Sequence, residues 1–418
     1  MKVTSRNSNI TTTGHRPELL APAGNQEKLE VAIHYGADAV YLGGNRFSLR
    51  ANAGNFTEEE LQQAVSLAHG KGVRVYVAVN IFAHQCDLRG LTEYFSFLQA
   101  IAVDGLIIAD PGILAIARRE VPELAIHLST QANVTNPESA AFWEAQGVAR
   151  INPSRELSLA EITALRRRVR AELEVFVHGA LCIAYSGRCF LSLYLTGRDA
   201  NRGDCAHPCR YRYRLEEEKR PNQFFPIEED SRGSYIFNAQ DLCLLTRLPE
   251  LIRAGADALK IEGRMKSLFY VGTVVRLYRA ALDFWQEHGL NAPLPPKFIA
   301  ELAKIGGRGQ SENFFHSPPE RKDMLYEGTT IKPNWAPVAI IRQGGSSPLV
   351  EARNPFNQGD SIEYLGQDLN NLVCQVTAIH DHEGRELTGA KPGSRLRLTL
   401  HSGSRNVNYQ RHGLFRQV

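Results

Sequence analysis

The sequence has no long apolar run, and this absence excludes a class of protein. Nowhere in its 418 residues do about 18 uninterrupted apolar residues occur, the length that spans a bilayer. The segment from Met1 to Arg16 is polar and lacks the apolar core of a secretion signal, so we expect a flexible N-terminus over residues 1–16. These features predict a cytoplasmic protein with no membrane partner.

The sequence also lacks a strong charge of one sign and the motifs of several enzyme classes. A formal net charge of +3 is too small to indicate a nucleic-acid partner by itself. There is no His-Glu-x-x-His zinc motif, no Gly-x-Ser-x-Gly nucleophile elbow and no Walker loop. Conventional hydrolase and NTPase chemistry is therefore unsupported.

Cysteine is scarce, but its distribution is uneven. Five of the seven cysteines lie between His178 and Cys243. In a large chain in a reducing compartment, thiolate ligands are favoured over disulfides. No Cys-x2-Cys pair occurs, which disfavours structural zinc, whereas irregular wide spacing suits an iron-sulfur cluster. Zinc and unligated thiols remain alternatives.

Five cysteines compete for the four ligand positions of a cluster. Only three residues separate Cys205 from Cys209, which would crowd a cubane. We expect a helix over residues 242–254 with Cys243 at its start, where a thiolate is stabilised. Cys209 is the alternative fourth ligand. The favoured metal ligands are Cys182, Cys189, Cys205 and Cys243.

From residue 17 the chain repeats one unit, a short apolar strand followed by a turn and a segment of helical period. Eight such units over roughly 270 residues predict an α/β fold, a TIM-type (β/α)8 barrel. A doubly wound sheet is the alternative, but no Gly-x-Gly-x-x-Gly follows the first strand. The expected strands are 18–21, 39–42, 74–79, 105–109, 125–128, 149–152, 174–177 and 258–261.

The chain divides into a large barrel and a smaller C-terminal domain. We expect the barrel over residues 17–290, with a cysteine-rich insertion at 178–243 after the seventh strand. Residues 291–331 form a linker and a helical segment. Residues 332–418 form a small all-β, barrel-like domain, because short alternating strands are separated by Gly, Asn and Asp turns. Its expected strands are 338–342, 349–352, 361–364, 372–379 and 395–400.

Polar side chains stand at the ends of most expected strands, where a TIM-type barrel has its active site. Arginines that converge there suit a small carboxylated substrate, because a guanidinium pairs a carboxylate bidentately. Some will instead pair with Glu18, Glu156 or Glu262 as scaffold. The candidate substrate-binding residues are Arg46, Arg50, Asn80, Gln131, Asn133, Arg155, Arg188 and Arg264.

Three further residues are catalytic candidates at the same end of the barrel: His178, Tyr185 and Glu262. His178 lies on the chain just before the first candidate ligand, Cys182. A histidine in this place acts as a proton donor, binds an anion, or packs under the insertion as a satisfied ring. The sequence leaves these three roles open.

The insertion is basic and aromatic. Cations bind phosphates and rings stack on unpaired bases, as a single-stranded RNA loop requires. A solvated loop balanced by residues 216–218 is the alternative. Arg405, Arg411 and Arg416 extend this patch or belong to a frayed C-terminal tail. The candidate RNA-binding residues are Arg202, Arg210, Tyr211, Arg212, Tyr213 and Arg214.

The block at residues 174–182, followed by residues 185–189, resembles the signature of the collagenase-like peptidase family. The resemblance covers most of the chain, including residues 19–24, 36–41 and 154–158. One loop departs from the family pattern. Residues 306–315 resemble its Arg-Gly-x-x-x-Gly-Phe loop but have Asn313 where glycine is usual.

The resemblance also implies a function. Residues 259–267 are most similar to members that use prephenate to install 5-hydroxyuridine at the wobble position of tRNA. Other relatives hydroxylate ubiquinone without oxygen, and four cysteines with closely matching spacing hold their 4Fe-4S cluster. The resemblance thus implies an iron-sulfur tRNA hydroxylase with tRNA and prephenate as substrates, and a homo-oligomer or a hetero-oligomer with a paralogue. A collagenase-like peptidase and a non-catalytic RNA-binding scaffold are the alternatives.

Overall fold

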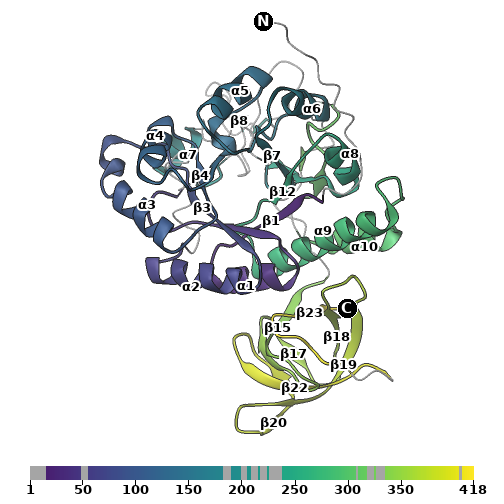
Figure 1. Ribbon diagram of the computed structural model, residues 1–418. Helices are drawn as coiled ribbons and strands as arrows, with labels where there is room; N and C mark the ends of the chain where they lie inside the picture. Colours follow the sequence, from purple (N-terminus) through teal and green to yellow (C-terminus); the bar gives the residue numbers. More distant parts are fainter. Residues whose placement is uncertain are drawn as a thin grey trace, which may run out of the picture.

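The fold is described from a computed structural model of the chain (Figure 1). Its described residues contain no helix that is both long enough and apolar enough to cross a membrane. The structure describes residues 16–48, 55–181, 190–198, 205–208, 215–216, 224–225, 238–306, 309–317, 324–325, 335–403 and 407–418.

Eight parallel strands close into a barrel (Figure 1). Each strand from β1 to β7 pairs with the next, and β12 closes the ring by pairing with both β7 and β1. The TIM-type barrel is therefore confirmed, and the open doubly wound sheet is excluded. The strands are β1 (Glu18–Pro22), β2 (Ala39–Leu42), β3 (Arg74–Val79), β4 (Gly105–Ile108), β5 (Ile126–Leu128), β6 (Arg150–Ile151), β7 (Glu172–Gly179) and β12 (Ala258–Ile261).

Helices surround the barrel and bury one face against it. Two of them begin with the capping boxes that their sequences indicate, Thr57 with Glu60 and Ser158 with Glu161. The long helix after β12 is α9 (Leu268–His288). The others are α1 (Gln26–His34), α2 (Glu58–His69), α3 (Leu91–Ala100), α4 (Pro111–Glu120), α5 (Pro137–Ala145), α6 (Leu159–Arg168) and α8 (Leu248–Arg253).

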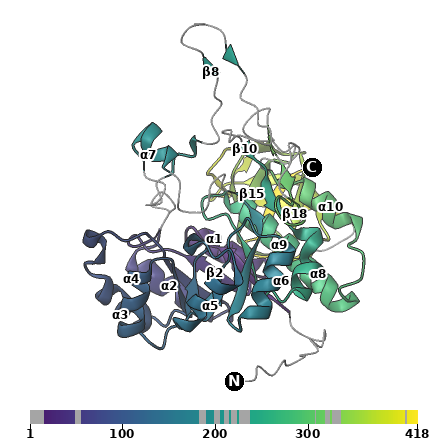
Figure 2. The same ribbon diagram turned by 90° about the horizontal axis from the view of Figure 1, so that it is seen from above.

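The chain between β7 and β12 contains short elements, of which α7 (Leu191–Thr196) and β8 (Leu215–Glu216) stand off the end of the barrel (Figure 2). The predicted helix over 242–254 is wrong over its first three residues, and a 3-10 helix at Leu245–Arg247 leads into the α-helix. Strand β11 (Asp241–Cys243) pairs antiparallel with the end of β7, and helix α8 starts only at Leu248. Smaller pieces are β9 (Phe224–Phe225), β10 (Asn238–Ala239), α10 (Pro296–Ala303), β13 (Gln310–Ser311) and β14 (Met324–Leu325).

The C-terminal domain is an antiparallel sheet in the order β18-β23-β15-β16-β22-β19, closed by a pairing of β18 with β19. All five predicted strands are present. The sixth, β23 (Leu414–Gln417), was missed, and Arg416 lies buried in it rather than in a frayed tail. The others are β15 (Pro337–Gln343), β16 (Leu349–Ala352), β17 (Phe356–Asn357), β18 (Ser361–Leu365), β19 (Leu372–His380), β20 (Glu386–Leu387), β21 (Gly389–Ala390) and β22 (Arg395–His401).

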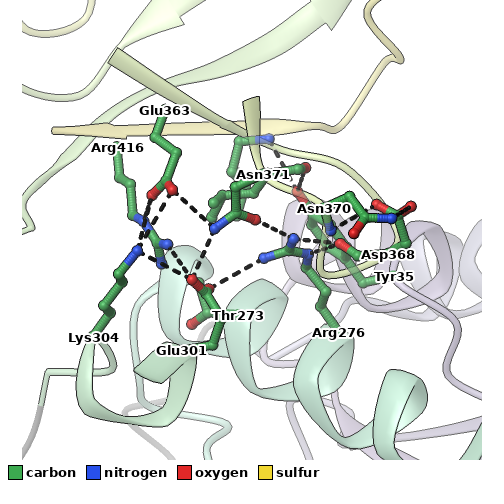
Figure 3. A network of polar contacts seen from close by, with 12 residues as sticks. Tyr35, Thr273, Arg276, Glu301, Lys304, Glu363, Asp368, Asn370, Asn371 and Arg416 are labelled. Atoms are coloured by element: carbon green, nitrogen blue, oxygen red, sulfur yellow. Dashed lines mark hydrogen bonds and ion pairs between the residues drawn. The ribbon is translucent and has the colours of Figure 1, made fainter. Parts of the chain in front are cut away.

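The two domains share a packed joint (Figure 3). Leu365 and Leu414 of the C-terminal domain belong to the same apolar cluster as the barrel helices. Polar groups in the joint are satisfied across it. Arg276 of α9 is 1% exposed and donates from Nε to the carbonyl of Asp368 at 2.7 Å, and Arg416 donates to Glu301 of α10 at 2.7 Å. The C-terminal domain is therefore docked on α1, α9 and α10.

Candidate active site at the barrel mouth

Charged side chains fill the barrel interior below the mouth. Arg150 lies 2.6 Å from Glu18, and Lys260 lies 2.6 Å from Glu174. Burial by itself would raise the pKa of Glu174, but Lys260 and Arg150 hold this pKa at about 2. We expected Glu18 to pair with one of the candidate arginines at the strand ends, and this is wrong, because Glu18 begins β1, lies at the opposite end and pairs with Arg150.

Three predicted substrate-binding residues meet at the carboxyl ends of β3 and β5. Asn80 donates from its amide to Gln131 Oε1 at 2.7 Å. Asn133 donates from its amide to the Gln131 carbonyl at 2.9 Å, and its φ of 54° places it in the left-handed region that asparagine tolerates. This amide cluster presents neutral donors and acceptors and no charge.

Arg155 and Glu262 lie together across the mouth. Both are nearly buried, and the closest guanidinium and carboxylate atoms are 4.0 Å apart. Arg155 also donates to the carbonyl of Ala180 at 2.7 Å and lies 3.9 Å from the centre of the Phe176 ring. Tyr41 donates its hydroxyl to Glu262 at 3.3 Å. The structure thus brings one predicted cation and one predicted catalytic carboxylate into contact.

Arg264 lies on the neighbouring side, after β12. Its guanidinium donates to Ser48 Oγ at 3.0 Å and to Asn55 Oδ1 at 2.6 Å, and its carbonyl accepts from Lys28 Nζ at 3.1 Å. Arg46, in contrast, is exposed and donates to the carbonyl of Arg89 at 3.0 Å. Arg264 therefore joins the mouth, whereas Arg46 lies on its outer rim.

His178 packs between two tyrosines of α9. Its Nδ1 lies 3.2 Å from the hydroxyl of Tyr278, and its ring centre is 5.8 Å from that of Tyr270. Burial lowers the pKa of His178 to about 4, so the ring is neutral at physiological pH. It borders a pocket of 160 Å³ with Asp241 and Tyr270. These contacts describe a packed, uncharged histidine.

Cys243 lies opposite His178 in the pairing of β11 with β7. Its Sγ is 3.8 Å from the Tyr278 hydroxyl, which also donates to the carbonyl of Val177 at 2.8 Å. Burial raises the pKa of the Cys243 thiol. The expectation of a thiolate stabilised at a helix start is wrong, because Cys243 is on a strand.

Of the predicted ligands of the iron-sulfur cluster, only Cys205 and Cys243 belong to the described residues. Cys205 and Cys243 are both free thiols, and Cys205 accepts from the backbone N–H of His207 at 3.3 Å. Within the described ranges, no three His, Cys, Asp or Glu side chains are grouped to hold a metal ion. The predicted residues outside the described ranges are Arg50, Cys182, Tyr185, Arg188, Cys189, Arg202, Arg210, Tyr211, Arg212, Tyr213 and Arg214.

Several residues of the mouth and of the barrel interior below it were missed from the sequence. Tyr41, Tyr270 and Tyr278 hold Glu262 and His178 in place, and Lys260 neutralises Glu174. A usable signal existed for Lys260, because a charge inside a short apolar strand indicates a barrel interior that contains its partner. The tyrosines carry no such signal, since Tyr41 lies in a buried strand and Tyr270 and Tyr278 lie on a long helix, where aromatic residues normally pack in the core.

The protein is a two-domain α/β protein, with a closed (β/α)8 barrel and a docked antiparallel β domain. Its candidate active site lies in the polar mouth, at the carboxyl ends of the barrel strands. The chain belongs to peptidase family U32. The profile of that family matches residues 24–325, and the profile of the family's C-terminal domain matches residues 335–409.

Several similar proteins carry names that refer to RNA. The chain is 39% identical over 379 residues to tRNA hydroxylation protein P1 of Bacillus subtilis (strain 168), covering 90% of each chain. It is 35% identical to tRNA hydroxylation protein P of Escherichia coli (strain K12), covering 84% of this chain and 86% of the other. It is also 35% identical to the Escherichia coli 23S rRNA 5-hydroxycytidine C2501 synthase, covering 77% of this chain and 46% of that protein.

Proposed function

We propose that this protein is an RNA hydroxylase that converts the wobble uridine of tRNA to 5-hydroxyuridine. One observation carries the proposal: 39% identity across 90% of both chains to a protein named for tRNA hydroxylation. The similarity to a 23S rRNA 5-hydroxycytidine synthase supports the same class of product, a pyrimidine hydroxylated at position 5. A base must leave its stack to reach a barrel mouth, so the tRNA loop presents an extruded uridine.

The co-substrate that we propose is prephenate, a small dicarboxylate with a ketone and a hydroxyl group. Arg155 and Arg264 are the cations at the carboxyl ends of β6 and β12 that would receive its carboxylates. The amides of Asn80 and Gln131 supply donors and acceptors for neutral oxygens. Glu262, held by Tyr41 and Arg155, is the carboxylate placed to hold a proton at this mouth.

We further propose that Cys182, Cys189, Cys205 and Cys243 hold a 4Fe-4S cluster. When bound, such a cluster supplies one-electron transfer. Cys243 is buried, lies opposite His178 in the strand pairing and has the hydroxyl of Tyr278 beside its sulfur, and this burial would limit the access of water to the sulfur. Only two of the four ligands, Cys205 and Cys243, belong to the described residues. The support for the full set of four is therefore the spacing of the cysteines and the family resemblance.

The cellular test is the modified nucleoside itself. A strain that lacks the gene should contain no wobble 5-hydroxyuridine in its tRNA, as measured by mass spectrometry of nucleosides. The wild-type gene should restore the nucleoside, and Cys182→Ala should not. Normal levels of 5-hydroxyuridine in the deletion strain would refute the proposal.

The cluster has its own test. Protein purified without oxygen should contain about four iron atoms and four acid-labile sulfides per chain, and Cys243→Ala should lose them. Cys374→Ala is the matched control, because Cys374 is also a buried thiol but belongs to the core of the C-terminal domain. Zinc, or full iron in Cys243→Ala, would remove the proposed ligand set.

A further inference from the structure

The outer face of β22 is a stripe of polar and basic side chains. Arg395, Arg397, Thr399 and His401 are exposed and alternate with Leu396 and Leu398, which are buried in the domain core. Side chains two residues apart on a strand are about 7 Å apart. The stripe thus presents cations at the spacing of successive phosphates along an extended nucleic-acid strand.

The cations of the stripe are only weakly neutralised by their neighbours. Arg397 donates to the neutral carbonyl of Ser347 at 2.9 Å. Arg395 is 71% exposed and lies 3.8 Å from Glu351, its partner in the pairing of β22 with β16. On the other side, β19 contributes Gln375, which is opposite His401. A polyanion would therefore meet positive charge and neutral hydrogen-bonding groups along this face, beside one carboxylate, Glu351, that Arg342 and Arg353 also neutralise.

A cluster of ion pairs connects the stripe to the barrel mouth. Glu351 binds Arg342 at 2.8 Å and Arg353 at 3.3 Å, and both arginines also bind Glu27. Glu27 is in the first turn of α1, which follows β1 and so lies at the mouth end of the barrel. Its neighbour Lys28 donates to the carbonyl of Arg264, a mouth residue. The positive surface of the C-terminal domain therefore begins beside the mouth.

We infer that Arg395 and Arg397 bind phosphates of the RNA substrate, so that the strand held at the mouth continues past the first turn of α1 onto β22. The inference rests on the proposed function, since it names where that substrate is held. RNA fits better than a protein partner, because the four outward residues of the stripe include no apolar side chain to form an interface core. Phosphate contacts position a nucleic acid without selecting its sequence.

The test measures binding of an unmodified tRNA transcript to the full-length protein by fluorescence anisotropy over a range of salt concentrations. Arg395→Gln combined with Arg397→Gln should reduce the slope of log K against log salt by about 2, since each lost phosphate contact removes about 1. Arg395→Lys with Arg397→Lys should keep the slope near the wild-type value.

Arg119→Gln is the matched control. Arg119 is 67% exposed, in the last turn of α4, at the end of the barrel opposite the mouth. An unchanged slope in the double Gln variant would overturn the assigned surface while the proposed function stands. A loss of about half that size in Arg119→Gln, which removes one charge where the double variant removes two, would also overturn it, because the effect would then follow from net charge alone. A wild-type protein that binds no tRNA would refute the proposed function itself.

Discussion

His127 shows how one buried side chain contributes to the acid stability of the barrel. It is 5% exposed, and its ring centre lies 4.4 Å from that of Tyr76 inside the barrel. Burial, followed by the nearby charge of Arg150, lowers its pKa from 6.5 to about 3. The folded protein therefore holds this ring neutral through a pH range in which the unfolded chain protonates it.

The consequence is a loss of stability in acid. Between pH 6.5 and 3 the unfolded state binds more protons at His127, so the free energy of unfolding should fall as the pH falls, by about 1.4 kcal/mol per pH unit. Urea unfolding at pH 7.5 and pH 5 measures the difference. His127→Phe should make it smaller, whereas His382→Phe, at a side chain 80% exposed, should not. Equal pH dependence in both variants would contradict the assignment.

Asn313 stands where the family pattern has glycine, and its backbone conformation explains why asparagine is tolerated there. Its φ is 47°, in the left-handed region, and its backbone N–H is bonded to Ser311 Oγ at 2.9 Å. Glycine adopts this conformation without cost, and asparagine is among the residues that tolerate it. The loop at residues 309–317 therefore retains a backbone that glycine would also permit.

At the scale of elements, the junction of β7 and β12 closes the barrel beside the candidate site. Gly179 ends β7 with a φ of 111°, and a Cβ there would lie 2.5 Å from the carbonyl oxygen of Glu262. Gly179→Ala should lower the free energy of unfolding by about 3 kcal/mol, from strain and overpacking together. Chemical denaturation measures this loss.

Gly72→Ala is the control for backbone strain alone. Gly72 also has a positive φ, 71°, but a Cβ there would meet nothing within 4 Å. Its loss should be only about 1 kcal/mol, the cost of a left-handed residue with a side chain. Equal losses of unfolding free energy in the two variants would show that the close approach of Gly179 to Glu262 does not affect stability.

At the scale of the whole molecule, Glu301 holds the two domains together (Figure 3). Its carboxylate binds Arg416 at 2.7 Å and Arg276 at 3.4 Å, and it accepts from the amide of Asn371 at 2.8 Å. Burial opposes the ionised form, but these arginines lower the pKa of Glu301 and keep it charged. Removing the charge would leave two buried guanidinium groups without this partner.

Glu301→Gln should therefore destabilise the joint by about 3–5 kcal/mol, the usual cost of breaking a buried ion pair from one side. Calorimetry should show the C-terminal domain melting before the barrel. Glu383→Gln, in an exposed pair with Arg385 in which Glu383 is 54% exposed, should change the melting temperature little. A single unshifted transition in Glu301→Gln would show that the joint does not depend on this carboxylate.

Local patterns were sufficient to predict the eight barrel strands and five of the six strands that close the C-terminal domain. Period and turn residues are properties of neighbouring positions. The apolar run at residues 242–245 fits a strand or a helix equally well, and the pairing of Leu242 and Cys243 with β7 decided for a strand at these two residues. In the sequence, Arg416 looks like a residue of a solvated tail. In the structure it is paired with Glu301 and Glu363.

The sequence by itself determined the barrel, its order of strands and the polar residues at their carboxyl ends, because backbone geometry turns a periodic pattern into a buried face. Only the tertiary structure decided which of these polar residues meet. Asn80 and Gln131 are 51 positions apart, and Glu27 and Arg353 are 326 apart, yet each pair is in contact. Such pairs depend on how elements far apart in the sequence pack together, and no local pattern of residues predicts that packing.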